Sequence, residues 1–196
     1  MTDILVLYYS RNGSVKKLAN HIARGIEESG CSARLRCVAP VSANHEASAP
    51  SIPGNGAPYV SKQDLLECAG ILIGSPTRFG NMAAPMKYFW DSTGAEWASG
   101  TLVGKPAAVF TATASMHGGQ ESTLLSMLLP LLHHGCLLVG IPFTEARLSS
   151  TRSGGTPYGA SHVSGGDGNN AFTDDETHLA RALGRRVGGL ALKLQP

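Results

Sequence analysis

The sequence predicts a parallel α/β sheet with helices on both of its faces. Three observations support this fold class. Short apolar runs without a polar break, typical of strands that are buried on both sides, recur along the 196 residues. Segments with the apolar period of an amphipathic helix alternate with these runs. Loops rich in glycine and hydroxyl residues follow several of the predicted strands.

The first element organises the rest of the chain. Residues 4–9 are apolar or aromatic and predict a buried strand, and apolar residues recur with a helical period over residues 15–26. Between them lies a polar loop with Ser10, Asn12, Gly13 and Ser14. Such a loop offers free N–H groups and the positive end of the helix dipole to an anion, which favours a phosphate site. An ordinary turn capped by Ser10 or Asn12 is the alternative interpretation.

The loop lacks the two common glycine-rich phosphate motifs. No Gly-x-x-x-x-Gly-Lys-Ser/Thr run occurs, and Gly104-Lys105-Pro106 fails because Pro106 has no N–H donor. No Gly-x-Gly-x-x-Gly follows the first strand, so a dinucleotide fingerprint is missing. A loop with one glycine and several hydroxyls suits a monophosphate, and flavin mononucleotide (FMN) is the candidate.

The remaining elements follow in order. Residues 33–37 alternate between apolar side chains and arginines, which predicts a half-exposed edge strand. Residues 39–61 show no apolar period, which predicts an insertion. A short helix is expected at residues 62–68. Buried strands are expected at 70–75 and 107–111, with a helix over 83–92 between them.

The last third of the chain predicts two helices and a fifth strand. Residues 122–134 form a helix that is apolar nearly all round, with a kink at Pro130, so it should be buried against both the sheet and a partner subunit. A strand is expected at 136–141. Residues 142–172 have many glycines and no period, which predicts a second insertion. Thr173 and Glu176 form a capping box that opens the last helix.

Composition narrows the classes of function. At this length, with 42% hydrophobic residues, we expect one domain over residues 1–196. A net charge of +2 without a basic run argues against nucleic acid as a partner. The charged fraction of 15% is low, which suggests a surface partly covered by other subunits. We expect a cytoplasmic protein, because there is no leader-like segment and no apolar run long enough for membrane insertion.

The loops after three of the predicted strands, at residues 10–15, 76–81 and 113–119, should converge beyond the carboxyl ends of the strands, where parallel sheets bind ligands. At these loops the sequence resembles a known family. The residues that carry the resemblance are Leu7-Tyr8-Tyr9-Ser10, Gly74-Ser75-Pro76-Thr77-Arg78-Phe79-Gly80-Asn81-Met82, Trp97-Ala98-Ser99-Gly100, Gly118-Gly119-Gln120-Glu121, His133-His134-Gly135, Gly154-Gly155-Thr156-Pro157-Tyr158-Gly159-Ala160 and Gly165-Gly166-Asp167-Gly168. In these runs the chain is similar to the WrbA-type NAD(P)H:quinone oxidoreductases. The similarity extends from the first predicted strand to the last predicted helix. The resemblance implies a flavodoxin-like three-layer sandwich with a five-stranded parallel sheet in the order 2-1-3-4-5. It also implies FMN as cofactor, NAD(P)H and quinones as substrates, and a homotetramer.

Carried over by position, the resemblance assigns roles to individual residues. The FMN-binding set is Ser10, Arg11, Asn12, Gly13, Ser14, Val15, Pro76, Thr77, Arg78, Phe79, Gly80, Asn81, Thr113, Ala114, Ser115, Met116, His117, Gly118 and His133. His133 is the candidate catalytic residue, reaching the flavin from its own helix or from a neighbouring subunit. Trp97 and Phe143 would border the substrate cavity. Many members of the family have an apolar residue and a tyrosine where this chain has Arg11 and Asn12, so the choice between NADH and NADPH stays open.

Other functions fit the residues less well. His133 and His134 are adjacent on a predicted helix and point about 100° apart, so they cannot share a metal ion. Ser10 and Ser115 lack the Gly-x-Ser-x-Gly elbow of a hydrolytic nucleophile. A flavodoxin-type electron carrier is the main alternative, but such carriers use a strongly acidic face to find their partners, and here acidic residues are scattered. We therefore expect two-electron reduction of quinones to hydroquinones by a ping-pong mechanism.

Overall fold

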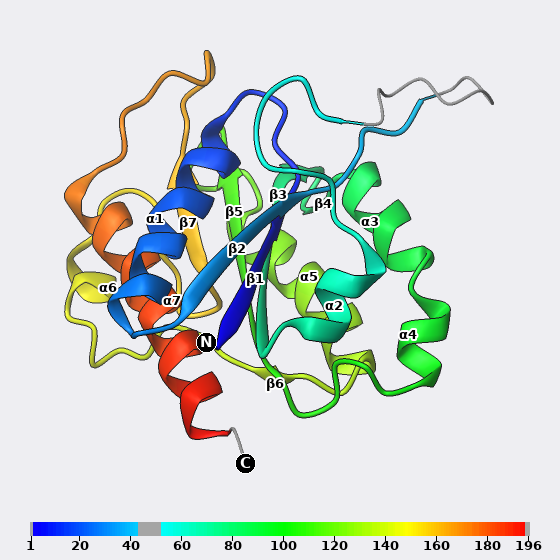
Figure 1. Ribbon diagram of the computed structural model, residues 1–196. Helices are drawn as coiled ribbons and strands as arrows, with labels where there is room; N and C mark the ends of the chain where they lie inside the picture. The colour runs from blue at the N-terminus through cyan, green and yellow to red at the C-terminus, as the bar shows by residue number, and fades with distance from the viewer. Residues whose placement is uncertain (1, 43–51, 195–196) are drawn as a thin grey trace.

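The computed structural model describes residues 2–42 and 52–194, so residues 43–51 of the predicted first insertion lie outside the described residues. Figure 1 shows a central sheet between two layers of helices, which confirms the predicted fold class. The strands are β1 (Asp3–Tyr8), β2 (Ser32–Cys37), β3 (Gly70–Arg78), β4 (Asn81–Met82), β5 (Pro106–Thr113), β6 (Leu137–Leu138) and β7 (Ala160–Val163). The helices are α1 (Ser14–Glu28), α2 (Lys62–Glu67), α3 (Ala84–Asp91), α4 (Gly94–Ala98), α5 (Gln120–His133), α6 (Arg147–Ser150) and α7 (Asp174–Lys193).

The sheet has the order β2-β1-β3-β5-β6, which is the 2-1-3-4-5 order that the resemblance implied. All pairs along this path are parallel, so the carboxyl ends of the strands lie at one edge. The predicted edge strand is confirmed, because every residue of β2 is only partly buried. The short β4 turns back against the end of β3 as an antiparallel pair.

The predicted fifth strand over 136–141 needs correction. Only Leu137 and Leu138 form β6, which pairs with the first two residues of β5. The other half of β5 pairs with β7, a strand inside the stretch that was predicted to be an irregular insertion. Two short segments thus share the fifth position of the sheet. Each is too short for a periodic apolar signal, which explains why the sequence did not reveal β7.

Alternate residues of the strands pack into two separate cores. Ile4, Val6 and Tyr8 of β1 join the core under α1 and α7, whereas Leu5 and Leu7 join the core under α2, α3 and α5. This is the pattern expected for a strand buried on both faces. The arrangement leaves the ends of β1, β3 and β5 free to carry loops at the carboxyl edge of the sheet (Figure 1).

The leucine-rich helix α5 is buried on one side only in the single chain. Leu124, Met127 and Leu131 are fully buried against the sheet, whereas its other side exposes a row of leucines: Leu125, Leu129 and Leu132. Pro130 lies inside the helix as predicted. Within the described parts of the chain, no helix is both long and apolar enough to cross a membrane.

Candidate active site

The loop after β1 builds an open cradle of N–H groups. The Ser10 hydroxyl oxygen accepts hydrogen bonds from the N–H groups of Gly13 (3.2 Å) and Lys16 (3.3 Å), which fixes the path of the loop. Gly13 ends the loop with φ of 91°, a left-handed conformation that favours glycine. Within the described residues, the N–H groups of Asn12, Ser14 and Val15 find no acceptor. Ser10 therefore shapes the turn, as in the ordinary capping interpretation, and still leaves donors for an anion.

These donors face a cavity of about 200 Å³, the phosphate cavity, at the carboxyl edge of the sheet. The three loops that the sequence predicted to converge all contribute to it. The lining residues are Ser10, Arg11, Asn12, Ser14, Val15, Pro76, Thr77, Arg78, Ala112, Thr113, Ala114, Ser164, Gly165, Gly166 and Gly168. Convergence of the loops after β1, β3 and β5 is what a parallel sheet of this order produces.

The loop after β3 combines a rigid base with an exposed tip. Thr77 is held by its hydroxyl oxygen, which accepts from the Thr123 hydroxyl (2.9 Å) and from the N–H of Gly80 (3.2 Å). The Arg78 guanidinium donates to the Thr77 carbonyl (2.7 Å). Phe79 has φ of 53°, the one left-handed non-glycine residue within the described chain, and its side chain is fully exposed. A strained residue with an exposed aromatic ring at a site edge is the kind of feature that ligand contact explains.

The loop after β5 is fixed at its start and open at its tip. The Thr113 hydroxyl donates to the Ser115 carbonyl (2.7 Å) and accepts from the Gln120 amide (3.0 Å). Ala114, Ser115, Met116 and His117 are exposed beyond this anchor. Of the predicted residues in this loop, Thr113 and Ala114 line the phosphate cavity, whereas those at 115–118 do not.

One wall of the phosphate cavity is missing from the predicted set. Ser164, Gly165, Gly166 and Gly168 line it, in the segment 164–168 that follows directly on β7. The glycine-rich run at 165–168 belonged to the family resemblance, so a signal was present, but no role was attached to it. The wall is held by backbone pairing, because the Ser164 N–H donates to the Thr113 carbonyl (2.8 Å) and its hydroxyl donates to the same oxygen (3.0 Å).

Glu176, at the start of α7, anchors β7 and the wall that follows it. One carboxylate oxygen accepts from the N–H groups of Gly154 and Val163 (both 3.0 Å) and from the Ser153 hydroxyl (2.8 Å). The other accepts from the Thr173 N–H and lies 2.9 Å from Nδ1 of His162. Burial alone would raise the pKa of Glu176, but these hydrogen bonds outweigh it and lower the pKa to about 2. The capping box predicted for the last helix is thus confirmed, and its Glu176 carboxylate also holds the end of β7.

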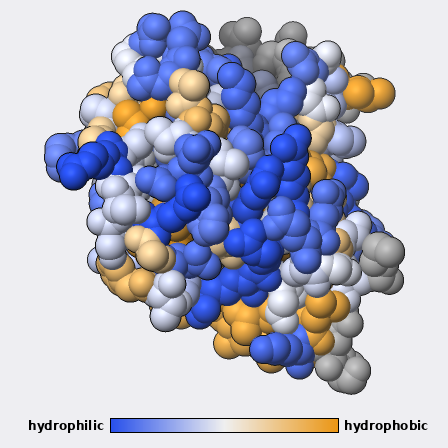
Figure 2. Space-filling model, turned by 90° about the vertical axis from the view of Figure 1, so that its left-hand side faces the viewer, coloured by the Kyte–Doolittle hydropathy of each residue, from blue (hydrophilic) through white to orange (hydrophobic). Residues whose placement is uncertain are grey.

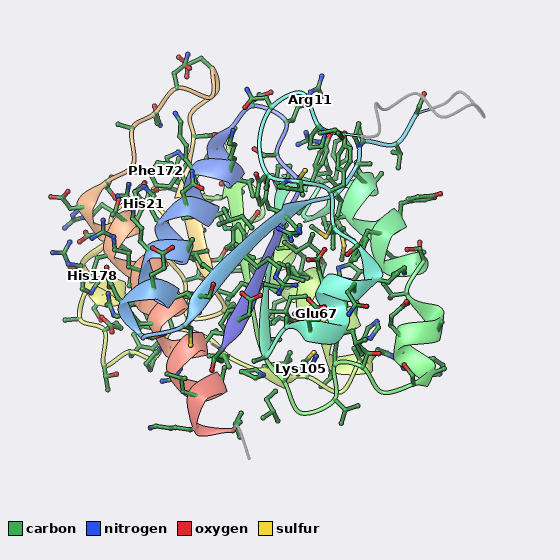
Figure 3. All side chains as sticks on the ribbon, in the orientation of Figure 1. Arg11, His21, Glu67, Lys105, Phe172 and His178 are labelled. Atoms are coloured by element: carbon green, nitrogen blue, oxygen red, sulfur yellow. The ribbon has the colours of Figure 1, made fainter. Side chains whose placement is uncertain are left out.

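Aromatic rings close the same network on its outer side. His162 stacks on Phe172, with ring centroids 3.8 Å apart and planes 10° from parallel, and Phe172 also packs against His21 of α1. Figure 3 shows His21 and Phe172 next to each other between α1 and the segment that leads into α7. The network therefore joins β7, α7 and α1 into one rigid support for the phosphate cavity.

His133 and Trp97 lie apart from the phosphate cavity in the single chain. They line a separate hollow of about 510 Å³, here called the aromatic hollow, with Trp90, Leu129 and His134. The Trp97 indole N–H donates to the His133 carbonyl (2.9 Å), so the structure brings these two predicted residues together. Asn81 lines the same hollow. Phe143 is exposed elsewhere, and its neighbours Pro142 and Thr144 border α7 near Arg185.

The neighbouring His134 has a different role from His133. It is buried, and burial lowers its pKa. Thr93 donates its hydroxyl to the Trp90 carbonyl (2.7 Å), so its oxygen accepts from Nε2 of His134 (3.0 Å). Nδ1 of His134 is then an acceptor, and within the described residues neither it nor the indole N–H of Trp90 has a partner. One donor and one acceptor are thus left unpaired in two of the residues that line the aromatic hollow.

Comparison with known proteins gives consistent matches. The family model of the NADPH-dependent FMN reductases matches residues 2–141. A protein of Gluconacetobacter diazotrophicus named NAD(P)H dehydrogenase (quinone) is 41% identical, and one of the same name from Chromohalobacter salexigens is 43% identical; each alignment covers 99% of both chains.

Solved structures show the same fold. The flavodoxin WrbA-like protein from Agrobacterium tumefaciens superposes with a TM-score of 0.69 at 21% identity over the whole of both chains. A flavodoxin from the domain Archaea has a TM-score of 0.65 at 19% identity, covering 97% of this chain and 99% of that one. With a family model matched over most of its length and full-length relatives above 40% identity, the chain belongs to the NADPH-dependent FMN reductase family, beside its members named NAD(P)H dehydrogenase (quinone).

Proposed function

We propose that this protein is an FMN-dependent NAD(P)H:quinone oxidoreductase that reduces quinones to hydroquinones by two electrons. The observation that carries the proposal is the cradle of unpaired N–H groups at Asn12, Ser14 and Val15, which opens into a cavity walled by the segments that follow β1, β3, β5 and β7. The names of the full-length relatives support the choice of substrates.

The residues present fit a flavin monophosphate. Three backbone donors at a helix N-terminus suit a phosphate dianion. The phosphate cavity holds about 200 Å³, less than a whole cofactor of this size fills, so the phosphate and ribityl chain would fit inside with the ring at the mouth. Arg78 lines the cavity, and the exposed Phe79 follows it in the same loop.

Bound FMN would supply the hydride and electron chemistry, and the protein would position and surround it. The loop after β1 holds the phosphate, and Thr77 and Thr113 fix the two loops that border the ribityl chain. Arg78 places positive charge near the ring edge, which favours a negatively charged reduced form. Reductant and quinone would use one opening in turn, which gives ping-pong kinetics.

The open side of the site supports assembly of several chains. Phe79, Met116 and three leucines of α5 are exposed apolar side chains, and one of these leucines, Leu129, lines the aromatic hollow. A second copy packed on α5 would cover exposed leucines, and we propose that it brings the His133 and Trp97 of one chain to the flavin of another. We therefore include a homotetramer in the proposal, in the cytoplasm, where NAD(P)H is available.

The visible spectrum of the purified protein tests the function. We expect flavin absorption that NAD(P)H bleaches without oxygen and that benzoquinone restores, with continuous turnover when both are supplied. A flavin that responds to neither NAD(P)H nor quinone would contradict the enzyme and favour an electron carrier that needs a protein partner. Protein that binds no flavin after incubation with FMN would contradict both.

A further inference from the structure

A second large cavity lies behind the loop that forms the phosphate cavity. It measures about 530 Å³ and is here called the tyrosine cavity, because Tyr8, Tyr9 and Tyr59 line it. Ser10 and Arg11 line both cavities, so the loop after β1 is the wall between them. The function proposed above gives the tyrosine cavity no role.

The outer wall of the tyrosine cavity is built by ordered backbone. Residues 57–60 continue the sheet beside the end of β2, where the Cys37 N–H donates to the Pro58 carbonyl (3.0 Å) and the Val60 N–H donates to the Cys37 carbonyl (2.9 Å). The Cys37 thiol adds a bond to the Ala57 carbonyl (3.1 Å). In Figure 3, Arg11 lies at the carboxyl edge of the sheet, where the loop that precedes α2 folds over.

The charged side chains that line the tyrosine cavity are positive and have no anionic partner among the described residues. Arg11 and Lys16 line it, and no carboxylate does so among the described residues. The Lys16 ammonium reaches only a neutral partner, the Asn55 carbonyl oxygen (3.1 Å). Arg11 has neither a hydrogen bond nor an ion pair to the rest of the described chain.

A buried hydroxyl points to the same place. Tyr8 is 3% exposed, and its oxygen accepts from the Ala57 N–H (3.4 Å), but its own O–H finds no acceptor within the described chain. Burial raises the pKa of Tyr8, so the group stays a donor. A Cβ placed on Gly56 would lie 3.5 Å from the Tyr8 hydroxyl and 3.8 Å from the Lys16 ammonium, which shows that these two groups converge on one point.

We propose that the tyrosine cavity binds the phosphorylated adenosine part of a nucleotide. Lys16, Arg11 and the Tyr8 hydroxyl would hold the phosphate, because all three are donors without an anionic partner. The rings of Tyr9 and Tyr59, which are partly exposed, offer faces for the base, since aromatic side chains stack on nucleobases. The inference rests on the proposed function for its source of ligand: NADPH carries such a group, and the cavity adjoins the flavin site through a shared loop.

Calorimetry with adenosine 2′,5′-bisphosphate and the FMN-loaded protein tests the inference. We expect binding that Lys16→Ala weakens roughly tenfold or more, because a charge-assisted hydrogen bond is lost. Lys17→Ala is the matched control, since Lys17 is exposed on the next position of α1 and does not line the cavity. Tyr8→Phe should weaken binding several-fold. Absence of binding, or equal weakening by Lys16→Ala and Lys17→Ala, would overturn the inference.

Steady-state kinetics distinguish two sources of the bound group, the adenosine end of NADPH and a separate nucleotide. If the site takes the end of the reductant, the bisphosphate competes with NADPH, and Lys16→Ala raises KM for NADPH more than KM for NADH. Binding without competition would assign the site to a separate nucleotide of the same chemistry. The flavin spectrum and the reduction of quinone by NADH do not depend on Lys16, so their loss would count against the proposed function and not against this site.

Discussion

The two sides of the candidate site are built in opposite ways. On the side of β7 and α7, a buried carboxylate, hydrogen-bonded backbone and stacked rings hold the wall of the phosphate cavity. On the side of α3 and α5, aromatic and leucine side chains are exposed around the aromatic hollow. Figure 2 shows that the face over α6 and α7 is mostly hydrophilic, as expected for a surface that meets water. On the proposed function, the phosphate end is complete within one chain, whereas the ring end needs a second one.

Removing the Glu176 carboxylate, which anchors the wall of the phosphate cavity, should have the largest effect on stability. Glu176→Ala leaves the N–H groups of Gly154, Val163 and Thr173 without their acceptor, and that of Gly154 is buried. We expect it to lower the free energy of unfolding by about 3–5 kcal/mol and to weaken FMN binding, because the 164–168 wall loses its support. Urea unfolding and FMN titration measure the two effects.

Asp175→Ala is the matched control for this change, since Asp175 is the next residue and forms a partly exposed ion pair with Arg147. It should cost less than about 1 kcal/mol. Equal losses for the two variants would show that the buried network does not support the wall.

The same carboxylate predicts a dependence of stability on pH. The pKa of Glu176 is lowered from 4.5 to about 2, so its ionised form stabilises the folded protein fully above the ordinary pKa. That contribution, roughly 3 kcal/mol, is lost as the pH falls from about 5 towards 2. Urea unfolding over this range should show a smaller loss in Glu176→Gln than in the unchanged protein. An identical pH profile for both proteins would refute the assignment.

A smaller effect is expected at the cradle itself. Gly13→Ala meets no atom within 4 Å, so its cost comes only from holding φ at 91°. We expect roughly 1 kcal/mol of strain and a several-fold weaker affinity for FMN. Gly189→Ala in α7, where there is also open space but no positive φ, should leave the FMN affinity unchanged. Unaltered affinity in Gly13→Ala would mean that the loop does not bind the phosphate.

The sequence revealed the parts of the molecule whose signals are local. The apolar run of β1, the turn at Gly13 and the capping box at Thr173 each depend on neighbouring residues, and the structure confirms all three as structural elements. The wall at 164–168 was missed because its position depends on Glu176 and Thr113, which are distant in sequence. The tyrosine cavity was missed for the same reason, since residues from β1, α1 and the 53–59 segment meet only in the fold.

Sedimentation velocity of the FMN-loaded protein, followed by protein and by flavin absorbance, tests most directly whether the ring end needs another chain. We expect the flavin to sediment with an assembled species. Leu129→Lys, which puts a charge on the exposed side of α5, should release smaller species with weaker FMN binding and little quinone reduction, whereas Leu66→Lys, at an exposed leucine of α2, should not. Circular dichroism must show that both variants are folded. A folded, flavin-loaded monomer with full activity would contradict the account.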